Sequence, residues 1–342
     1  MMVSRRWIAV VAGVFAVCAS APVSAADPVK NPTGDATDEA KEEKKGEKAV
    51  EVPAVKVSDE AKRTKANEPI GEYDQPSWTL DRPFSSARAY VNPPGETEIN
   101  VFHIPTMNLS ADRPSKSSED GGGGGSEESV EKPTFVENTT EIELETGIGH
   151  RLQVDYYLVM AQETKLNPKG ADTKKSWGDM HVAEQKFELR WAFADWGKIW
   201  GNPTLYAEFA HGGGPPSVEP KLLLSGNLSN KLFGAANLVW ERKLGGEEKE
   251  QEYGLTLALN YLVSDPELFA GVEAVVETAD TKEKRFDFKK YEVLGGPSLQ
   301  WYPMETVHVG LNPKVGVEIE KEEGETESKV LFQPMVTLGY AI

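Results

Sequence analysis

Charged side chains recur at every second position in several segments between residues 136 and 342, as at Glu184, Lys186, Glu188 and Arg190. A period of two returns side chains to the same face of a strand, so these residues would line one common surface. Carboxylates that line a water-filled passage favour cations and repel anions. The residues that we expect on this surface, as candidates for selectivity, are Glu143, Asp155, Glu184, Glu188, Arg190, Glu208, Glu252, Glu273, Glu292 and Lys314.

The same pattern allows a second interpretation, in which the charged surface is filled instead of open. Lys186, Arg190 and Lys314 could pair with the surrounding carboxylates and form a salt-bridged plug. Carboxylates outnumber the basic residues in either case. The pattern therefore predicts an acidic interior and leaves a plug and a narrow channel as equal alternatives.

Catalytic and metal-binding patterns are weak. His308 and Ser298 fall on neighbouring expected strands, but no carboxylate completes a recognisable arrangement with them. Pairs at metal-ligand spacing are missing among the histidines, which are His103, His150, His181, His211 and His308. We therefore predict no catalytic residue, no metal site and no cofactor.

Alternating apolar residues define the elements that would position these charges. In residues 252–262 the apolar phase is Tyr253, Leu255, Leu257 and Leu259, and five other segments show the same period. The apolar phase of these segments carries no ionised side chain, as expected if it faces lipid, where a charge would cost about 2–4 kcal/mol. The pattern predicts an all-β fold, a transmembrane antiparallel up-and-down β-barrel. A soluble β-sandwich or barrel with the apolar phase as its core is the alternative.

The connections between these segments supply a second regularity, because short and long ones alternate. The shorter connections are 147–150, 195–203, 229–230, 264–266 and 303–306, and the longer ones are 164–180, 212–220, 243–250, 278–288 and 321–328. Outer-membrane barrels place short turns in the periplasm and long loops outside. Counting residues 99–104 as the first strand, we expect 12 strands with both termini periplasmic.

Aromatic residues in the apolar phase lie near several strand ends. These candidates for contact with the lipid headgroups are Trp191, Trp240, Tyr253, Tyr261, Trp301 and Tyr340. Aromatic girdles at both membrane interfaces are typical of transmembrane barrels.

The first 25 residues resemble a secretory signal peptide. Arg5 and Arg6 precede an apolar stretch at 7–19, and small residues at 23–25 suit a cleavage site. A membrane-anchoring helix is the alternative, although the apolar stretch is short for a span.

Composition divides the rest of the chain. Residues 26–75 are rich in charged residues and poor in aromatic ones, which predicts a disordered periplasmic segment. Residues 76–135 form a partly ordered lead-in with the first strand and a Gly-rich loop at 121–125, and 136–342 form the barrel.

Charge and cysteine content exclude further classes. The formal net charge is −18, which disfavours nucleic-acid binding because that requires basic surfaces. The single cysteine, Cys18, lies in the expected signal peptide, so the mature chain would contain no disulfide.

Three stretches resemble a known family. Residues 141–154 (EIELETGIGHRLQV), 187–208 with FELRWA and GNPTLYAE, and 296–301 (GPSLQW) are similar to motifs of outer-membrane β-barrel transporters of the phenol meta-pathway, or channel-like, barrel family. The resemblance covers about residues 136–342. It implies a porin-like Gram-negative outer-membrane barrel that takes up small, often hydrophobic compounds.

We therefore expect a passive channel or transporter for small solutes, with an acidic, cation-favouring lumen. A plugged structural or surface-interaction barrel without transport is the alternative. The expected partners are outer-membrane lipid and lipopolysaccharide, the barrel-insertion machinery and small solutes. The sequence does not name the substrate or the oligomeric state.

Overall fold

The computed structural model describes residues 64–85, 90–109, 134–166, 176–245, 251–280, 288–322 and 325–342. All of them belong to one compact unit, Lys62–Ile342. The expected signal peptide, most of the charged segment at 26–75 and the Gly-rich loop at 121–125 lie outside the described residues.

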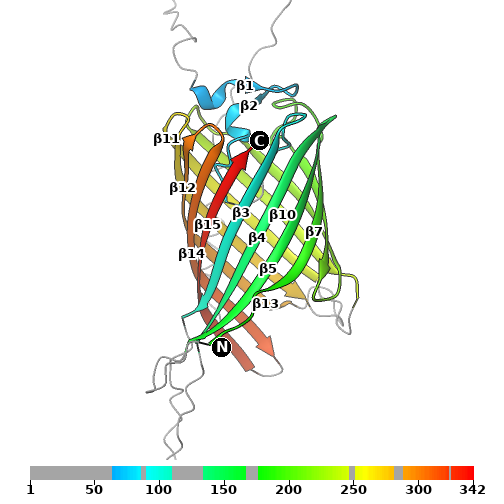
Figure 1. Ribbon diagram of the computed structural model, residues 1–342, viewed down its shortest axis with the longest axis vertical. Helices are drawn as coiled ribbons and strands as arrows, with labels where there is room; N and C mark the ends of the chain where they lie inside the picture. The colour runs from blue at the N-terminus through cyan, green and yellow to red at the C-terminus, as the bar shows by residue number, and fades with distance from the viewer. Residues whose placement is uncertain are drawn as a thin grey trace, which may run out of the picture. The chain divides into compact units, whose positions relative to one another are not determined.

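Twelve of the described strands form a closed antiparallel barrel, as predicted (Figure 1). Their bounds are β3 (Thr97–Asn108), β4 (Thr134–Gly149), β5 (Leu152–Leu166), β7 (His181–Ala192), β8 (Thr204–Gly212), β9 (Ser217–Asn227), β10 (Leu232–Lys243), β11 (Gln251–Ser264), β12 (Leu268–Asp280), β13 (Phe288–Met304), β14 (Val307–Glu322) and β15 (Glu325–Ala341). Each strand pairs with its sequence neighbours, and β3 pairs with β15 to close the ring. A two-residue strand, β6 (Ser176–Trp177), adds to the end of β5.

The two phases of each strand face opposite ways. Apolar side chains point outward, with Val272 at 57% and Val315 at 53% relative exposure. Charged side chains point inward, and Glu143 and Arg190 are fully buried. This arrangement is the reverse of a soluble barrel, in which the apolar phase would form the core.

Three prolines inside the last strands leave the barrel continuous. Pro313 lies opposite Pro334 in the β14–β15 pair. In the β13–β14 pair, pairing stops at Gly295 and resumes at Leu299, so Pro297 falls in a short unpaired stretch. Gly296 is needed there because a Cβ atom would overlap the carbonyl oxygen of Pro313. Pro313 faces the same unpaired stretch, and Pro334 lies in an unpaired stretch between β15 and β3, so each proline lacks pairing on one side only. The prediction that the prolines are bulges or locally unpaired positions and do not break the strands is confirmed.

The connections fall at two ends of the barrel. One end, the turn end, carries the tight turn at His150–Arg151 and residue Ile342, whose backbone N–H donates to Thr97. The other, the loop end, carries the connection expected at 321–328, which is shorter than predicted because β14 and β15 extend into it. Among the described residues, no helix is long and apolar enough to cross a membrane.

Order in the described chain begins earlier than the sequence suggested. Residues expected to belong to the disordered segment instead form η2 (Lys65–Asn67) and β1 (Pro69–Ile70), followed by β2 (Gln75–Pro76) and η3 (Ser77–Thr79). Figure 1 shows β1 and β2 at the turn end of the barrel. Residues 64–85 and 90–96 are called the N-terminal plug below. Their early order follows from tertiary contacts, since Asp265 accepts hydrogen bonds from the backbone of Lys65 and Ala66.

The N-terminal plug packs inside the barrel through an aromatic core. Trp78 and Phe84 are 2% and 3% exposed, and their ring centroids lie 6.1 Å apart. Trp78 contacts Phe233 of β10 at 4.9 Å, and Phe233 in turn contacts Phe269 of β12 at 5.8 Å. The core therefore lies in the lumen at the turn end, where apolar residues of the inward phase meet the plug.

Hydrogen bonds hold the plug to several parts of the wall. Ser85 N–H donates to Glu273 of β12 at 2.7 Å, and Asn92 N–H donates to Gln153 of β5 at 2.7 Å. Asn260 of β11 donates to the carbonyl of Pro83 at 2.6 Å. The plug is therefore bonded to the wall on both β5 and β11–β12 and crosses the lumen.

The outward face leads to a stability prediction. Val315 lies at the middle of β14, so Val315→Arg should place a charge in the centre of the apolar belt and lower the free energy of unfolding by about 2–4 kcal/mol. Met304→Arg adds the same charge at a strand end and should cost about 0–1 kcal/mol. Urea titration of both variants in lipid vesicles measures the difference. Equal losses would contradict a lipid-facing belt.

Candidate solute site in the lumen

A row of acidic side chains runs obliquely along one wall of the barrel, from Glu98 at the turn end to Glu219 near the loop end. The strand register places each member directly opposite the next on six neighbouring strands, in the order Glu98, Glu145, Asp155, Glu188, Glu208 and Glu219. This carboxylate row faces inward and is largely buried. Like charges directly opposite each other on paired strands repel, so the row needs cations beside it.

Arg190 of β7 supplies one of these cations. Its guanidinium is fully buried, lies 3.2 Å from Asp155 Oδ2, and donates to Glu188 through Nε. The same side chain lies 3.8 Å from Glu143 and 3.9 Å from Glu145. Arg190 therefore contacts carboxylates of β4, β5 and β7 together.

Arg82 of the N-terminal plug supplies a second cation from outside the wall. Its Nη1 lies 2.5 Å from Glu143 Oε2 and 3.3 Å from Glu145 Oε1, and its Nη2 donates to Glu143 Oε1 at 3.3 Å. Burial alone would lower the pKa of Arg82, but the charges of Glu143 and Glu145 and the hydrogen bond to Glu143 raise it above its ordinary value. Arg82 is therefore permanently charged at this site.

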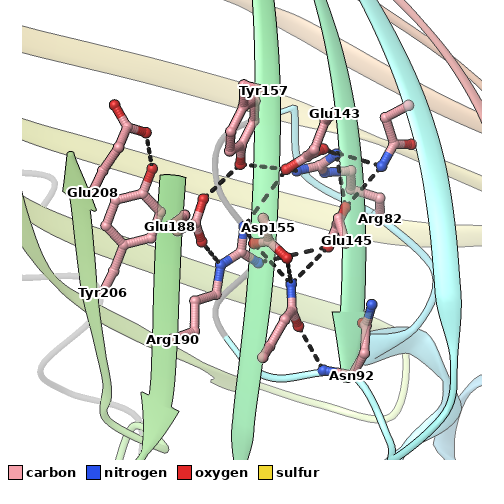
Figure 2. Close-up of polar contacts among 12 residues, drawn as sticks. Arg82, Asn92, Glu143, Glu145, Asp155, Tyr157, Glu188, Arg190, Tyr206 and Glu208 are labelled. Atoms are coloured by element: carbon pink, nitrogen blue, oxygen red, sulfur yellow. Dashed lines mark hydrogen bonds and ion pairs between the residues drawn. The ribbon is translucent and has the colours of Figure 1, made fainter. Parts of the chain in front are cut away.

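Neutral polar groups tie the carboxylates together, as Figure 2 shows. The Tyr157 hydroxyl lies within hydrogen-bond distance of both Glu143 and Glu188, and its single proton can serve one of them at a time. Gln153 donates to Glu145 and to Asp155 at 2.9 Å. These bonds fix the carboxylate positions in the low-dielectric interior, where buried polar groups need partners.

Closer to the loop end the charged groups become accessible to water. Lys186 lies 3.6 Å from Glu208 and 3.9 Å from Glu141, and its side chain is 22% exposed. Lys221 pairs with Glu219 at 2.6 Å and lies 4.3 Å from the centre of the Tyr206 ring. The buried group of Glu143, Glu145, Asp155, Glu188 and Arg190 is called the dry cluster below. Toward the loop end, the lumen therefore changes from this dry cluster to ion pairs that are accessible to water.

The opposite wall carries a second group of charges at the loop end. Glu277, Glu292 and Glu318 lie directly opposite one another on β12, β13 and β14. Lys290 and Lys329 lie 3.1 Å and 3.2 Å from Glu318. Carboxylates again stand side by side with lysines at their margin.

The structure brings together part of the predicted selectivity set. Glu143, Asp155, Glu188 and Arg190 meet in the dry cluster, with Glu208 beside them. Two members lie further away on the opposite wall, where Glu273 binds the plug backbone and Lys314 is 6% exposed on β14. The remaining members, Glu184, Glu252 and Glu292, are half-buried on β7, β11 and β13.

The predicted interface aromatics lie on the outer face near the strand ends. Trp191, Tyr261, Trp301 and Tyr340 are exposed near the turn end. Trp240 and Tyr253 lie opposite each other at the loop end of β10 and β11, with Trp240 exposed and Tyr253 half-buried.

The dry cluster also contains the group with the spacing of a metal site. One oxygen each of Glu143, Asp155 and Glu188 lies within 4.8 Å of the others. Arg190 already lies within 4 Å of all three carboxylates, so these groups have a cationic partner from the chain itself. His308 does not complete a triad with Ser298 among the described contacts, and it pairs instead with Glu98 at 3.1 Å.

Sequence reasoning missed the residues that connect the site. The sequence pattern assigns Arg82 only to the lead-in segment, and it does not single out Tyr157, Gln153 or Asn100 as site residues. The sequence does contain one indication of Arg82. It is the only basic residue between Trp78 and Phe84, in a segment where aromatic residues reappear. The others follow from strand register, which the alternation does not determine.

No protein-family model matches the chain, and no curated protein has a matching sequence. Solved structures that it resembles include an outer-membrane channel from Pseudomonas putida F1, at 11% identity and a TM-score of 0.47, over 76% of this chain and 100% of that one. The translocator domain of the autotransporter NalP from Neisseria meningitidis has 12% identity and a TM-score of 0.40, and the match covers 73% of this chain and 89% of that one. The KdgM porin in complex with disordered oligogalacturonate has 11% identity and a TM-score of 0.36, and the match covers 71% of this chain and 98% of that one. Membership of the phenol meta-pathway family stays a prediction.

The buried cluster leads to a second prediction. Arg190→Ala should leave the carboxylates of three strands without their shared cation and lower the free energy of unfolding by about 3–5 kcal/mol. Arg151→Ala removes a half-exposed pair with Asp195 at 3.0 Å and should cost about 0–1 kcal/mol. Urea unfolding followed by tryptophan fluorescence compares the two variants. If Arg190→Ala lowered the free energy of unfolding no more than Arg151→Ala does, the buried carboxylates would not need Arg190 to offset their repulsion.

Proposed function

We propose that the protein is an outer-membrane β-barrel channel for small cationic solutes, held closed in this conformation by its N-terminal plug. The observation that carries the proposal is the division of each strand into an apolar outer face and an acidic inner face around a closed barrel. A closed barrel leaves no unpaired strand edge, which is the condition for crossing lipid with strands.

The spacing of the outer aromatics supports a membrane-spanning belt. Tyr253 and Tyr261 stand at opposite ends of β11, and Leu259 lies between them on the outer face. Eight residues of strand extend about 26 Å at roughly 3.3 Å per residue. A tilt of about 40° reduces this to roughly 20 Å along the barrel axis, close to the ~25 Å apolar band of outer-membrane barrels.

Cation preference follows from the charges on the inner face. The carboxylate row crosses half of the wall, and Glu277, Glu292 and Glu318 extend the negative charge on the other side. Lysines near the loop end pair with some of these groups without balancing them. A pore with this lining concentrates cations and excludes anions.

The N-terminal plug also favours a second candidate function, a permanently filled barrel that serves as a structural or surface-interaction protein. Trp78 and Phe84 bury apolar surface in the lumen, and Arg82 pairs with Glu143. If these contacts never open, the barrel conducts nothing. The two functions therefore differ in whether the plug moves.

Orientation and partners extend the proposal. Short turns face the periplasm in outer-membrane barrels, so the turn end, with the plug and Ile342, would be periplasmic. The loop end would meet lipopolysaccharide, and the barrel-insertion machinery would assemble the protein.

Conductance measurements on the full mature chain test the proposal. Asn67 of the plug and Asn227 of β9 are joined by a hydrogen bond of 2.5 Å, so Asn67→Cys with Asn227→Cys can be linked by a short bis-methanethiosulfonate, which forms a reducible disulfide bond with each thiol. We expect openings in planar bilayers before linkage, loss of openings after linkage, and recovery on reduction. In a salt gradient, the reversal potential should shift toward the cation equilibrium potential because carboxylates line the path.

Each single-cysteine variant treated with the same reagent serves as the matched control and should keep its openings. Silence of the unlinked protein across many insertions would support the filled structural barrel. Openings that persist in the linked protein would show that the plug does not close the path, and an anion-selective reversal potential would contradict the acidic lumen.

A further inference from the structure

We propose that the pocket around Arg82 is a receptor for the guanidinium group of a solute, and that Arg82 occupies it as a tethered stand-in while the channel is closed. This inference rests on the proposed function, since a solute reaches the pocket only when the Arg82 side chain has left it. It adds a specific site and a ligand class to a channel that otherwise selects by charge alone.

The barrel wall supplies a complete set of contacts for a guanidinium. Both oxygens of Glu143 face Arg82, one with each terminal nitrogen, and Glu145 adds a contact at 3.3 Å. This two-pronged geometry matches a planar guanidinium to a planar carboxylate. The Phe102 ring lies 4.8 Å from the Arg82 Cζ atom and provides an aromatic face for the cation.

The receptor groups are held by the barrel independently of the plug. Asn100 of β3 donates to Glu143 at 3.1 Å and to Glu145 at 2.7 Å, while Tyr157 and Gln153 bond the same carboxylates from β5. Glu143 and Glu145 are both fully buried. Departure of Arg82 would therefore leave two positioned carboxylates without this cation, a state that favours the entry of another cation.

Unused polar atoms point to capacity for a ligand at this site. Asn100 is fully buried, and its Oδ1 has no hydrogen-bond partner among the described residues. Arg82 Nε likewise lacks an acceptor within the described part of the chain. A free alkylguanidinium lacks the backbone constraint on Arg82, so it can rotate and direct its N–H groups to acceptors that Arg82 Nε does not reach.

The geometry favours a guanidinium over an ammonium ion. A lysine-like ammonium is a compact, strongly hydrated point charge, whereas a guanidinium is flat, weakly hydrated and able to bind two oxygens while stacking on a ring. The pocket presents two planar carboxylates and one aromatic face. Solutes carrying an arginine-like head group therefore fit it best.

The tether explains why the intact chain would not bind such solutes strongly. A group held by a short chain segment has an effective concentration on the order of mM, so Arg82 competes with any free guanidinium. Shortening this one side chain should expose the receptor without removing any barrel residue.

Chemical rescue of Arg82→Ala tests the proposal on the full mature chain. The variant should melt at a lower temperature than the native protein, because Glu143 and Glu145 lose their cation. Ethylguanidinium at roughly ten times its Kd should raise the melting temperature of the variant by about 2–4 °C, while the native protein shifts little. Ethylurea has nearly the same shape without the charge and should have no effect.

Matched variants separate this site from general salt effects. Arg151→Ala also removes an arginine from a carboxylate, but from a half-exposed pair, and should show no rescue. Arg82→Ala combined with Glu143→Gln should lose the rescue, because the two-pronged acceptor is gone. Rescue of Arg151→Ala to the same extent, or equal rescue by ethylurea or ethylammonium, overturns the guanidinium site.

A variant that fails to fold still gives an answer. Arg82→Ala and Arg82→Gln can be refolded into detergent with each probe and scored by heat-modifiable gel migration. Recovery with ethylguanidinium alone supports the site, and no recovery overturns it. These readouts do not depend on conductance, so the two proposals can fail separately. If the protein conducts but ethylguanidinium does not rescue Arg82→Ala, the receptor site is rejected. If ethylguanidinium rescues the variant but the protein never conducts, the channel function is rejected.

Discussion

Repulsion between facing carboxylates inside the barrel is the constraint on which the described structure depends. Glu145, Asp155 and Glu188 lie directly opposite one another on paired strands and are nearly inaccessible to water. Such a row is stable only with cations in contact with it, and Arg190 and Arg82 supply them. Because Arg190 belongs to the wall and Arg82 to the N-terminal plug, part of the charge balance of the barrel comes from a segment outside the twelve barrel strands.

This division links closure of the lumen to its electrostatics. The plug contributes an aromatic core around Trp78 at the turn end and a guanidinium deeper in the lumen. Withdrawal of the plug would open the path and at the same time uncover Glu143 and Glu145. In the proposed channel, an open conformation would thus be more acidic than the closed one, and the event that admits a solute would also increase the attraction for a cation.

The outer face obeys a separate constraint. Lipid offers no hydrogen bonds and penalises charge, so the strands close into a ring and present Val, Leu and aromatic side chains outward. The two constraints meet in each strand, where alternate residues satisfy one or the other. Prolines such as Pro297 and Pro313 are tolerated because the ring of hydrogen bonds resumes on either side of them.

The sequence by itself determined the twelve-strand barrel and the face on which each strand residue lies, because lipid imposes a period-two pattern that is local in the chain. It did not determine which inward residues meet, since the contact of Glu145 with Asp155 and Arg190 depends on strand register and closure. It also placed residues 64–75 in a disordered segment, because their composition is polar and their order comes from contacts with distant turns, such as Asp265. The role of Arg82 was decided by tertiary structure alone. No local pattern predicts the partner of this arginine, and its ion pair forms because folding brings it within 2.5 Å of Glu143, a buried residue 61 positions away in the chain.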